Sequence, residues 1–205
     1  MYGIHDFWVF LAAALVVNIT PGPDMIYVAT RSAAQGRAAG VVSALAIGAG
    51  CLVHITAAVL GLSAVLMYSA TAFTALKLAG AGYLVFLGIK ALRESNAPAL
   101  EKMAKAPLKK VFRQGVVINV LNPKVALFFL AFLPQFTDHA GNFALQMGIM
   151  GSIFCFTGTV TLVLVALGVD RAGAWMQSAD ASRWRGRISG TAFIGLGAFL
   201  AVSDN

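Results

Sequence analysis

Apolar residues fill this chain in long runs instead of alternating with polar ones. Six such segments can be drawn against the roughly 20 residues that a helix needs to cross a bilayer. They span Ile4–Thr30, Ala38–Met67, Ala70–Leu92, Gln114–Pro134, Phe143–Val169 and Ile188–Val202. Runs of this length are typical of membrane helices, so the pattern predicts an all-α integral membrane protein with six transmembrane helices.

Two of the six segments are interrupted by proline motifs of the same kind. The first reads Asn18-Ile19-Thr20-Pro21-Gly22-Pro23-Asp24, and the second reads Asn119-Val120-Leu121-Asn122-Pro123-Lys124. Proline cannot donate a backbone hydrogen bond, so it interrupts a helix. In a membrane, the carbonyl groups that it frees are tolerated only where protein or a wet cavity surrounds them. The motifs therefore predict that the first and fourth helices are broken and line a transport site.

Composition supports a membrane protein. The 205 residues are 59% hydrophobic and only 11% charged, against about 25% charged in a soluble domain. We expect a single transmembrane domain over residues 1–205, without a cofactor or metal. Cys51 and Cys155 lie within apolar segments, where free cysteines act as small buried hydrophobes.

The basic residues are distributed unevenly along the chain. Thirteen of the fifteen fall in alternate connections between segments: Arg31 and Arg37 in the first, Lys90, Arg93, Lys102, Lys105, Lys109, Lys110 and Arg113 in the third, and Arg171, Arg183, Arg185 and Arg187 in the fifth. Such connections lie in the cytoplasm. Six spans with both termini outside, in the periplasm, satisfy this pattern. The net charge of +7 thus reflects topology and does not indicate a nucleic-acid partner.

The chain divides into halves of three spans, about 1–97 and 98–205, joined by a basic loop over 93–113. Because three is odd, the second half enters the membrane in the opposite sense to the first. If the halves share a fold, they form a 3+3 inverted repeat with a pseudo-two-fold axis in the membrane plane.

Glycines at close-packing spacing recur in the apolar segments. They are Gly36-x3-Gly40, Gly186-x3-Gly190 and the run Gly80, Gly82 and Gly88. Small residues let helix backbones approach each other in a membrane. Packing within one bundle is favoured here over a homodimer interface.

Each break ends in a charged residue, Asp24 in the first half and Lys124 in the second. Asp24 suits the first turn of the resumed helix, as a structural cap or as a group facing the transport pathway. Lys124 follows Pro123, which suits the first position of a helix. The two charges could form an ion pair, or they could complement the ammonium and carboxylate of a zwitterion. The sequence leaves both interpretations open.

The candidate substrate and proton pathway comprises Asn18, Thr20, Pro21, Gly22, Pro23, Asp24, Asn119, Asn122, Pro123 and Lys124. The polar members could satisfy backbone groups freed by the prolines or bind a ligand. His54, deep in the second segment, is either a proton relay or a hydrogen-bonded packing residue, and the second interpretation is favoured. Lys77 lies near the outer end of its segment and is expected to snorkel.

These motifs strongly resemble the lysine exporter (LysE/RhtB) family. The resemblance rests on Asn-x-Thr-Pro-Gly-Pro-Asp, on Gly36-Arg37-x-x-Gly40 and on Asn119-x-x-Asn122-Pro123-Lys124. It extends over the whole chain in length, segment order and motif position. It implies a multi-pass transporter of the bacterial inner membrane that exports amino acids or related metabolites, driven by the proton gradient. Homodimers have been proposed within such families, and nothing in the sequence decides that point.

The function expected is therefore a proton-coupled exporter of a small amino acid. Asp24 is the candidate proton carrier, because substrate ammonium and proton would compete for its carboxylate. Since Asp24 is the one acidic residue deep within an apolar segment, a neutral zwitterion is favoured over a cationic substrate. A channel, or an exporter of another small metabolite, is the alternative. No Gly-x-Ser-x-Gly or His-Glu-x-x-His motif occurs, and the chain is not expected to be an enzyme.

Overall fold

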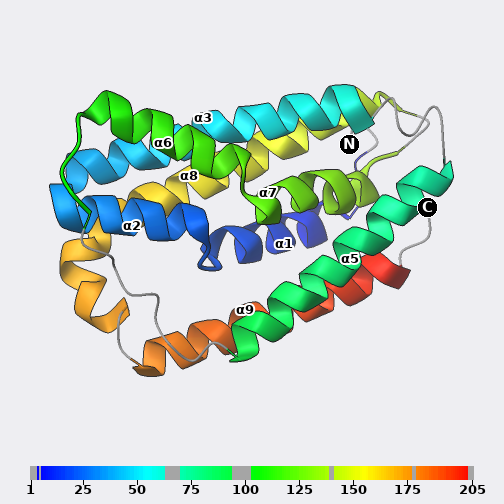
Figure 1. Cartoon of the computed structure of the whole chain (residues 1–205). Helices are drawn as coiled ribbons and strands as arrows, with labels where there is room; N and C mark the ends of the chain where they lie inside the picture. The colour runs from blue at the N-terminus through cyan, green and yellow to red at the C-terminus, as the bar shows by residue number, and fades with distance from the viewer. Residues whose placement is uncertain are drawn as a thin grey trace.

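The computed structural model describes residues 4, 6–62, 70–93, 103–138, 141–176 and 179–202, almost all of them helical (Figure 1). In chain order the elements are α1 (Phe7–Ile19), α2 (Pro23–Gln35), α3 (Arg37–Ala57), the π-helical turn η1 (Ala58–Leu62), α5 (Ala70–Arg93), α6 (Leu108–Val120), α7 (Pro123–Leu127), the π-helical η2 (Phe128–Phe132), the 3-10 helix η3 (Leu133–Phe136), α8 (Phe143–Met176) and α9 (Ala179–Val202). One isolated antiparallel bridge joins Ile4 to Thr137, and the described residues form no strand beyond it. The all-α prediction is confirmed.

The described residues contain two helices long and apolar enough to cross a membrane, Arg37–Gly61 and Phe143–Gly168. Two bent pairs bring the number to four if each pair is one span. They are α1 with α2, bent by 46°, and α6 with Pro123–Phe136, bent by 45°. Both predicted breaks are therefore confirmed, with nearly equal bends. The count of six spans stays a prediction.

Helices extend further than the apolar segments that predicted them. α6 begins at Leu108, six residues before the expected start at Gln114, and α8 and α9 together cover most of 171–187. The basic connections are thus partly helical and shorter than expected. The physical reason is that Lys and Arg are good helix formers, so the end of an apolar run does not mark the end of a helix. Residues 94–102 of the expected loop lie outside the described residues.

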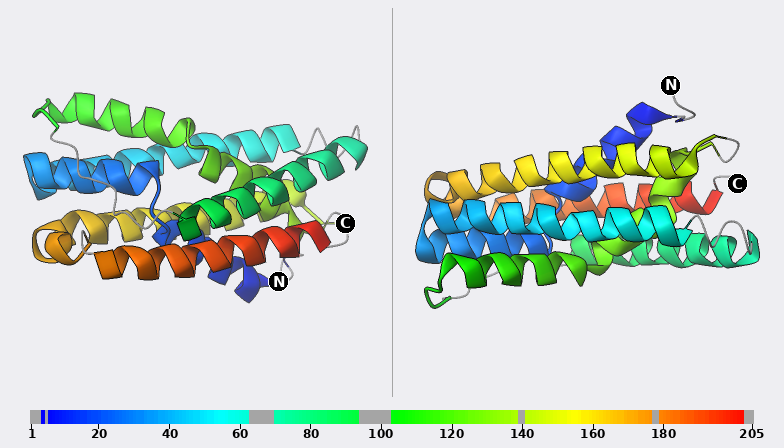
Figure 2. Two further views of the ribbon diagram at one scale, coloured as in Figure 1. Left: turned by 60° about the horizontal axis from the view of Figure 1, so that its bottom comes forward. Right: turned by 90° about the horizontal axis from the view of Figure 1, so that it is seen from above.

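The helices form two groups that meet at the broken segments (Figure 2). α3 packs against α2, α6 and α8, while α5 lies along α9 and touches η2. Glycine permits the closest approach: a Cβ atom on Gly88 would lie 2.7 Å from the carbonyl oxygen of Gly190. Gly80 likewise packs directly against Ala131 of η2. Intramolecular packing is confirmed at these glycines, whereas Gly82 faces open space.

Several polar residues are buried beside the apolar core, and many large apolar residues are exposed. Asp24, Asn119 and Asn122 are buried, whereas Leu121 is 73% and Phe156 is 70% exposed. Exposed apolar surface of this extent marks a face that meets lipid or protein. The distribution is consistent with a membrane protein whose mainly apolar interior contains a small group of polar residues.

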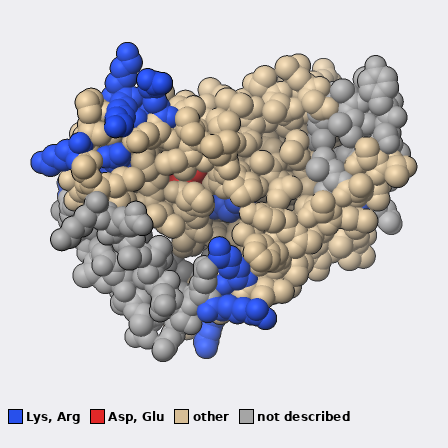
Figure 3. Space-filling model, in the orientation of Figure 1, with Lys and Arg blue, Asp and Glu red and all other residues tan. Residues whose placement is uncertain are grey.

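Charge separates the two ends of the molecule. Lys and Arg side chains gather at one end and along the lower edge of the face in Figure 3. Both chain termini lie at the other end (Figure 1). The described basic residues of the α2–α3 corner and of the first turns of α6 belong to the basic end, and those in the last turn of α5 lie on the lower edge.

Two basic residues occupy positions that the sequence did not predict. Arg31 was expected in a connection, but it lies in α2 and is buried, because α2 continues to Gln35 and only Gly36 separates it from α3. Lys77 is also buried, so the expectation that it snorkels is wrong. It lies one turn from Gly80, on the flank where α5 packs against η2.

Candidate functional site

The two helix breaks lie next to each other near the middle of the molecule (Figure 1). At the first, Pro21 and Pro23 lack backbone donors, and Gly22 between them is extended, with φ −162°. α2 starts again at Pro23, where the missing N–H is not needed. Asp24 lies in the first turn of α2, at the positive end of the helix dipole, as the sequence predicts. Its side chain bonds to Asn119 and not to a backbone N–H of α2, so it does not cap the helix through a hydrogen bond.

The second break is built differently. Asn122 is the N-cap of α7, and its Oδ1 accepts a hydrogen bond from the backbone N–H of Lys124 at 3.0 Å. Pro123 occupies the first position of α7, as predicted. Since an N-cap side chain fixes the direction in which a helix starts, Asn122 orients α7 and with it Lys124. Asn122 thus provides a hydrogen-bond partner for a backbone N–H group at the break, which is one of the two roles proposed for it.

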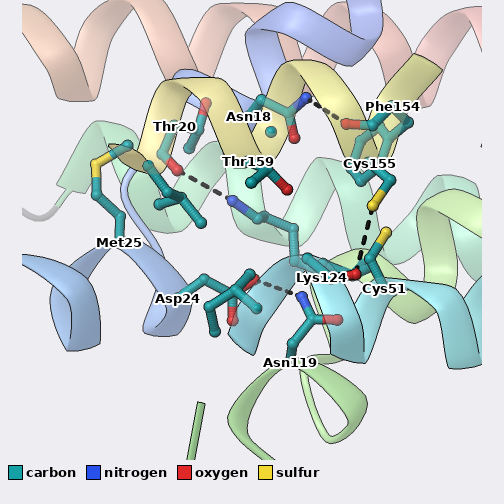
Figure 4. A pocket seen from close by; sticks show the side chains of 15 residues that line it. Asn18, Thr20, Asp24, Met25, Cys51, Asn119, Lys124, Phe154, Cys155 and Thr159 are labelled. Carbon is teal, nitrogen blue, oxygen red and sulfur yellow. Dashed lines mark hydrogen bonds between the residues drawn. The ribbon is translucent and has the colours of Figure 1, made fainter. Parts of the chain in front are cut away.

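Lys124 reaches from the second break to the first. Its Nζ donates to the backbone carbonyl oxygens of Val17 and Thr20, each at 3.0 Å. Figure 4 shows the contact with Thr20. These carbonyls belong to the last turn of α1, where helix carbonyls lack intrahelical partners and attract cations. Gly22 makes room for the contact, because a Cβ atom there would lie 3.2 Å from Nζ. Lys124 therefore caps the helix that the first break interrupts.

Asp24 reaches in the opposite direction, from the first break to the second. Its Oδ2 accepts a hydrogen bond of 2.9 Å from the side-chain amide of Asn119, in the last turn of α6. The backbone oxygen of Asn119 lies 2.9 Å from Nε2 of His54. A carbonyl oxygen can only accept, so Nε2 carries the proton in this contact. His54 also stacks on Phe129, with ring centroids 6.0 Å apart. The site thus connects α2, α6 and α3.

Asp24 and Lys124 line one cavity, but they form no direct ion pair. Lys124 is bonded to the carbonyls of α1, and Asp24 to Asn119. The physical reason is that the proline break leaves unpaired carbonyls within reach of the ammonium, and these take two of its three donors. The ion pair, one of the two interpretations that the sequence left open, does not form between these described side chains, and the proposed complement to a zwitterion stays open.

Three buried polar atoms of this cluster have no hydrogen-bond partner. They are Oδ1 of Asp24, Oδ1 of Asn119 and Nδ2 of Asn122. Leaving a buried polar group unpaired costs roughly 1–3 kcal/mol, so native structures rarely keep several of them together. Asp24 and Asn119 line the cavity, whereas Asn122 does not, so the cavity offers a small polar ligand two acceptors besides the third N–H of Lys124.

The remaining predicted residues support the first break. Asn18 donates through Nδ2 to the carbonyl oxygen of Phe154, at 3.2 Å, and to the hydroxyl of Thr157, at 3.0 Å. The hydroxyl of Thr20 donates to the carbonyl of Val16, at 2.7 Å. Asn18 thereby attaches the end of α1 to α8, and both residues line the cavity.

The cavity between the breaks has a volume of about 30 Å³. One water needs roughly 10–15 Å³ on such a measure, and ligand pockets usually reach 300 Å³ or more. The cavity has room for one or two water molecules, and it would have to widen to accommodate an amino acid. On the side of the chain termini, stacked Phe128 and Phe154, with centroids 4.4 Å apart, belong to a large aromatic core.

The sequence analysis did not predict that residues of α3 and α8 line the cavity. Gly48, Cys51, Cys155, Gly158 and Thr159 line it (Figure 4). Cys51 and Cys155 are free, and Sγ of Cys155 lies 3.4 Å from the carbonyl oxygen of Gly48. The available signal was a cluster of small and weakly polar residues in the middle of otherwise bulky apolar segments. Among the described residues, no three His, Cys, Asp or Glu side chains are grouped as metal ligands.

The chain matches a family model described as LysE type translocator over residues 15–204. It is 28% identical to a homoserine/homoserine lactone efflux protein of Salmonella typhimurium, over 96% of both chains. It is 27% identical to a leucine efflux protein of the same organism, over 67% of this chain and 66% of the relative. An uncharacterized membrane protein of Bacillus subtilis is 29% identical over 98% of this chain and all of its own. No solved structure matches the chain.

Proposed function

The chain belongs to the LysE family of translocators, and on that premise we propose that it is a secondary transporter exporting neutral amino acids or close derivatives. The relatives named for homoserine, homoserine lactone and leucine efflux support this substrate class. These compounds share an amino group and an uncharged side chain. The single deep carboxylate in the described site, Asp24, suits one ammonium group and offers no second anion for a cationic side chain.

The observation that carries the proposal is the set of unpaired polar atoms around the cavity. Oδ1 of Asp24 and Oδ1 of Asn119 would accept hydrogen bonds from the substrate ammonium. The third N–H of Lys124, which lines the same cavity, would donate to its carboxylate or lactone carbonyl. A zwitterion between the two breaks would satisfy these three groups at once, so hydrogen-bonding capacity that the described side chains leave unused would contribute to substrate binding.

The cavity is too small for an amino acid, so in this proposal the structure corresponds to a closed state of a site that opens during transport. We propose that six spans form a 3+3 inverted repeat, with halves at about 1–97 and 98–205, and that the halves rock around the two breaks. The matching bends of 46° and 45° support this arrangement. Opening on one side would enlarge the cavity enough for an amino acid, while the aromatic core around Phe128 and Phe154 closes the side of the termini.

Orientation follows from the separation of charge. We place the basic end in the cytoplasm of a bacterial inner membrane and both termini in the periplasm, as the positive-inside rule requires. Export would then load substrate from the basic end and release it at the end where the termini lie (Figure 1).

Proton antiport would use the same carboxylate as the substrate. With Asp24 protonated the ammonium has no counter-charge, and with Asp24 ionised the site can take the ammonium. One group that binds either proton or substrate, but not both, produces exchange. His54 touches the backbone of Asn119, so in this proposal it positions Asn119, and a relay through it would need a further rearrangement.

The test is transport by the purified protein in proteoliposomes, with radiolabelled leucine or homoserine and an imposed pH gradient. The proposal predicts saturable exchange, uphill export driven by inward proton flow, and loss of the proton-driven component in Asp24→Asn. A channel would give flux that neither saturates nor exchanges. Proton-driven uphill transport by Asp24→Asn at the parent rate would refute the assignment of Asp24 as the carrier.

A further inference from the structure

A second hollow lies outside the substrate cavity, between α2, α6 and the segment that leads into α6. It is an open groove of about 740 Å³. Its wall carries Lys109, Lys110 and Arg113, together with Tyr27 and Gln114, and none of its lining residues is acidic. The proposed transport mechanism makes no use of this groove. Three cations around one concave surface indicate an anionic ligand.

The first turn of α6 adds to the positive potential. Its N-cap is Pro107, which supplies no capping side chain, and no acidic residue occupies the first turn. Lys109 and Lys110 instead place two positive charges at the positive end of the helix dipole. This arrangement disfavours the helix unless an anion is nearby. Backbone N–H groups at a helix start are also common ligands for phosphate.

A buried arginine, which does not itself line the groove, contacts two of the residues that do and adds positive charge behind them. Arg31 is 4% exposed, and its Nε has no hydrogen-bond partner. Its terminal nitrogens donate to the carbonyl of Ala104, at 3.0 Å, and to Oε1 of Gln114, at 2.8 Å. Its guanidinium lies over the ring of Tyr27, 5.7 Å from the centroid. None of these partners is an anion, and two of them, Gln114 and Tyr27, line the groove.

Below the cations, the same face of α6 becomes apolar. Val117 lines the groove and is 54% exposed, and Leu121, one turn on, is 73% exposed. From Lys110 to Leu121 the helix rises by about 16 Å, at 1.5 Å per residue. Half of the hydrocarbon core of a bilayer is about 15 Å thick. The face therefore matches a charged head group followed by an acyl chain that reaches the middle of the membrane.

We propose that this groove binds an anionic phospholipid. The phosphate lies among Lys109, Lys110 and Arg113 at the start of α6, and one acyl chain follows α6 past Val117 to Leu121. A free phosphate would account for the cations but not for the apolar continuation. Binding there joins α6 to the segment held by Arg31 and so steadies one wall of the transport site, since Asn119 belongs to the same helix.

The test titrates the full-length protein in detergent with phosphatidylglycerol or phosphatidylcholine of identical acyl chains and counts bound lipid by native mass spectrometry. The proposal predicts that phosphatidylglycerol binds at least about tenfold more tightly, because basic residues near the membrane surface attract an anionic head group. The variant K109Q/K110Q/R113Q should lose that preference.

A matched variant, K90Q/R93Q/R187Q, removes three charges from positions that do not line the groove and should keep the preference. Thermal unfolding confirms that both variants fold. Equal binding of the two lipids by the parent protein would overturn the proposal, as would equal losses in the two variants. Displacement of phosphatidylglycerol by inorganic phosphate at comparable concentrations would show a site for a soluble anion and would also overturn it.

Discussion

The side-chain amide of Asn119 donates to the carboxylate of Asp24 at 2.9 Å, across the two broken helices of the protein. Lys124, at the second break, donates to the carbonyl oxygens of Val17 and Thr20 at the first break. Each resumed helix thus sends its charged residue to the end of the other interrupted helix. The charges are held apart on either side of a small cavity.

Removing the amide that holds Asp24 should disturb both stability and transport. In Asn119→Ala the carboxylate loses its hydrogen bond, and a buried acceptor left without a partner costs roughly 1–3 kcal/mol. We expect a lower melting temperature and weaker substrate binding, measured by thermal unfolding and by exchange in proteoliposomes.

The matched control is Asn142→Ala. Asn142 accepts a hydrogen bond from the backbone N–H of Leu145 at the start of α8, away from the cavity. Its loss should lower stability without changing substrate affinity. Parent-like exchange by Asn119→Ala would contradict the positioning role of the amide.

Substitution of Lys124 should lower both the stability of the protein and its transport activity. Lys124→Gln removes the charge that caps α1, and hydrogen bonds to charged groups contribute roughly 1.5–3 kcal/mol each. Lys124→Arg keeps donors for Val17 and Thr20 but presents a wider, planar group to the cavity. We expect thermal unfolding to show a larger loss for Gln than for Arg, and both variants to lose exchange. Equal stability of the two would argue against the cap.

Gly22 is expected to matter through the space that it leaves. Its extended backbone suits any residue, but a Cβ atom would lie 3.2 Å from Nζ of Lys124. Gly22→Ala should therefore fold and slow exchange by displacing the ammonium. Gly82→Ala is the control, because nothing lies within 4 Å of a Cβ atom there, and it should transport like the parent. Exchange by Gly22→Ala at the parent rate would refute the steric argument.

Much of this architecture could be predicted from the sequence, because proline and long apolar runs act locally. The broken helices, the place of Pro123 and the position of Asp24 in the first turn of the resumed helix follow from residues next to one another. The partners of the charges could not be predicted in the same way. Lys124 meets Val17, and Arg31 meets Gln114, only once the two halves have packed together.

The residues of α3 and α8 that line the cavity could not be predicted from the sequence either. Cys51 and Cys155 look like ordinary small residues in apolar segments, and only the tertiary structure places them at the cavity. The ends of helices were also misjudged where basic residues continue a helix past its apolar part, as at the start of α6.

The most direct test of the account is recognition of the two ends of a zwitterion. Proteoliposomes or thermal shifts would compare leucine with its amino alcohol, which lacks the carboxylate, and with its hydroxy acid, which lacks the amine. We predict that the parent prefers leucine to both and that Asp24→Asn loses at least about tenfold of its preference over the hydroxy acid, a difference of about 1.4 kcal/mol. In thermal shifts, which do not require exchange, Lys124→Arg keeps the positive charge and should retain a preference for binding leucine over the amino alcohol. An Asp24→Asn protein that still discriminates against the hydroxy acid as strongly as the parent would contradict the assignment of Asp24 to the substrate ammonium.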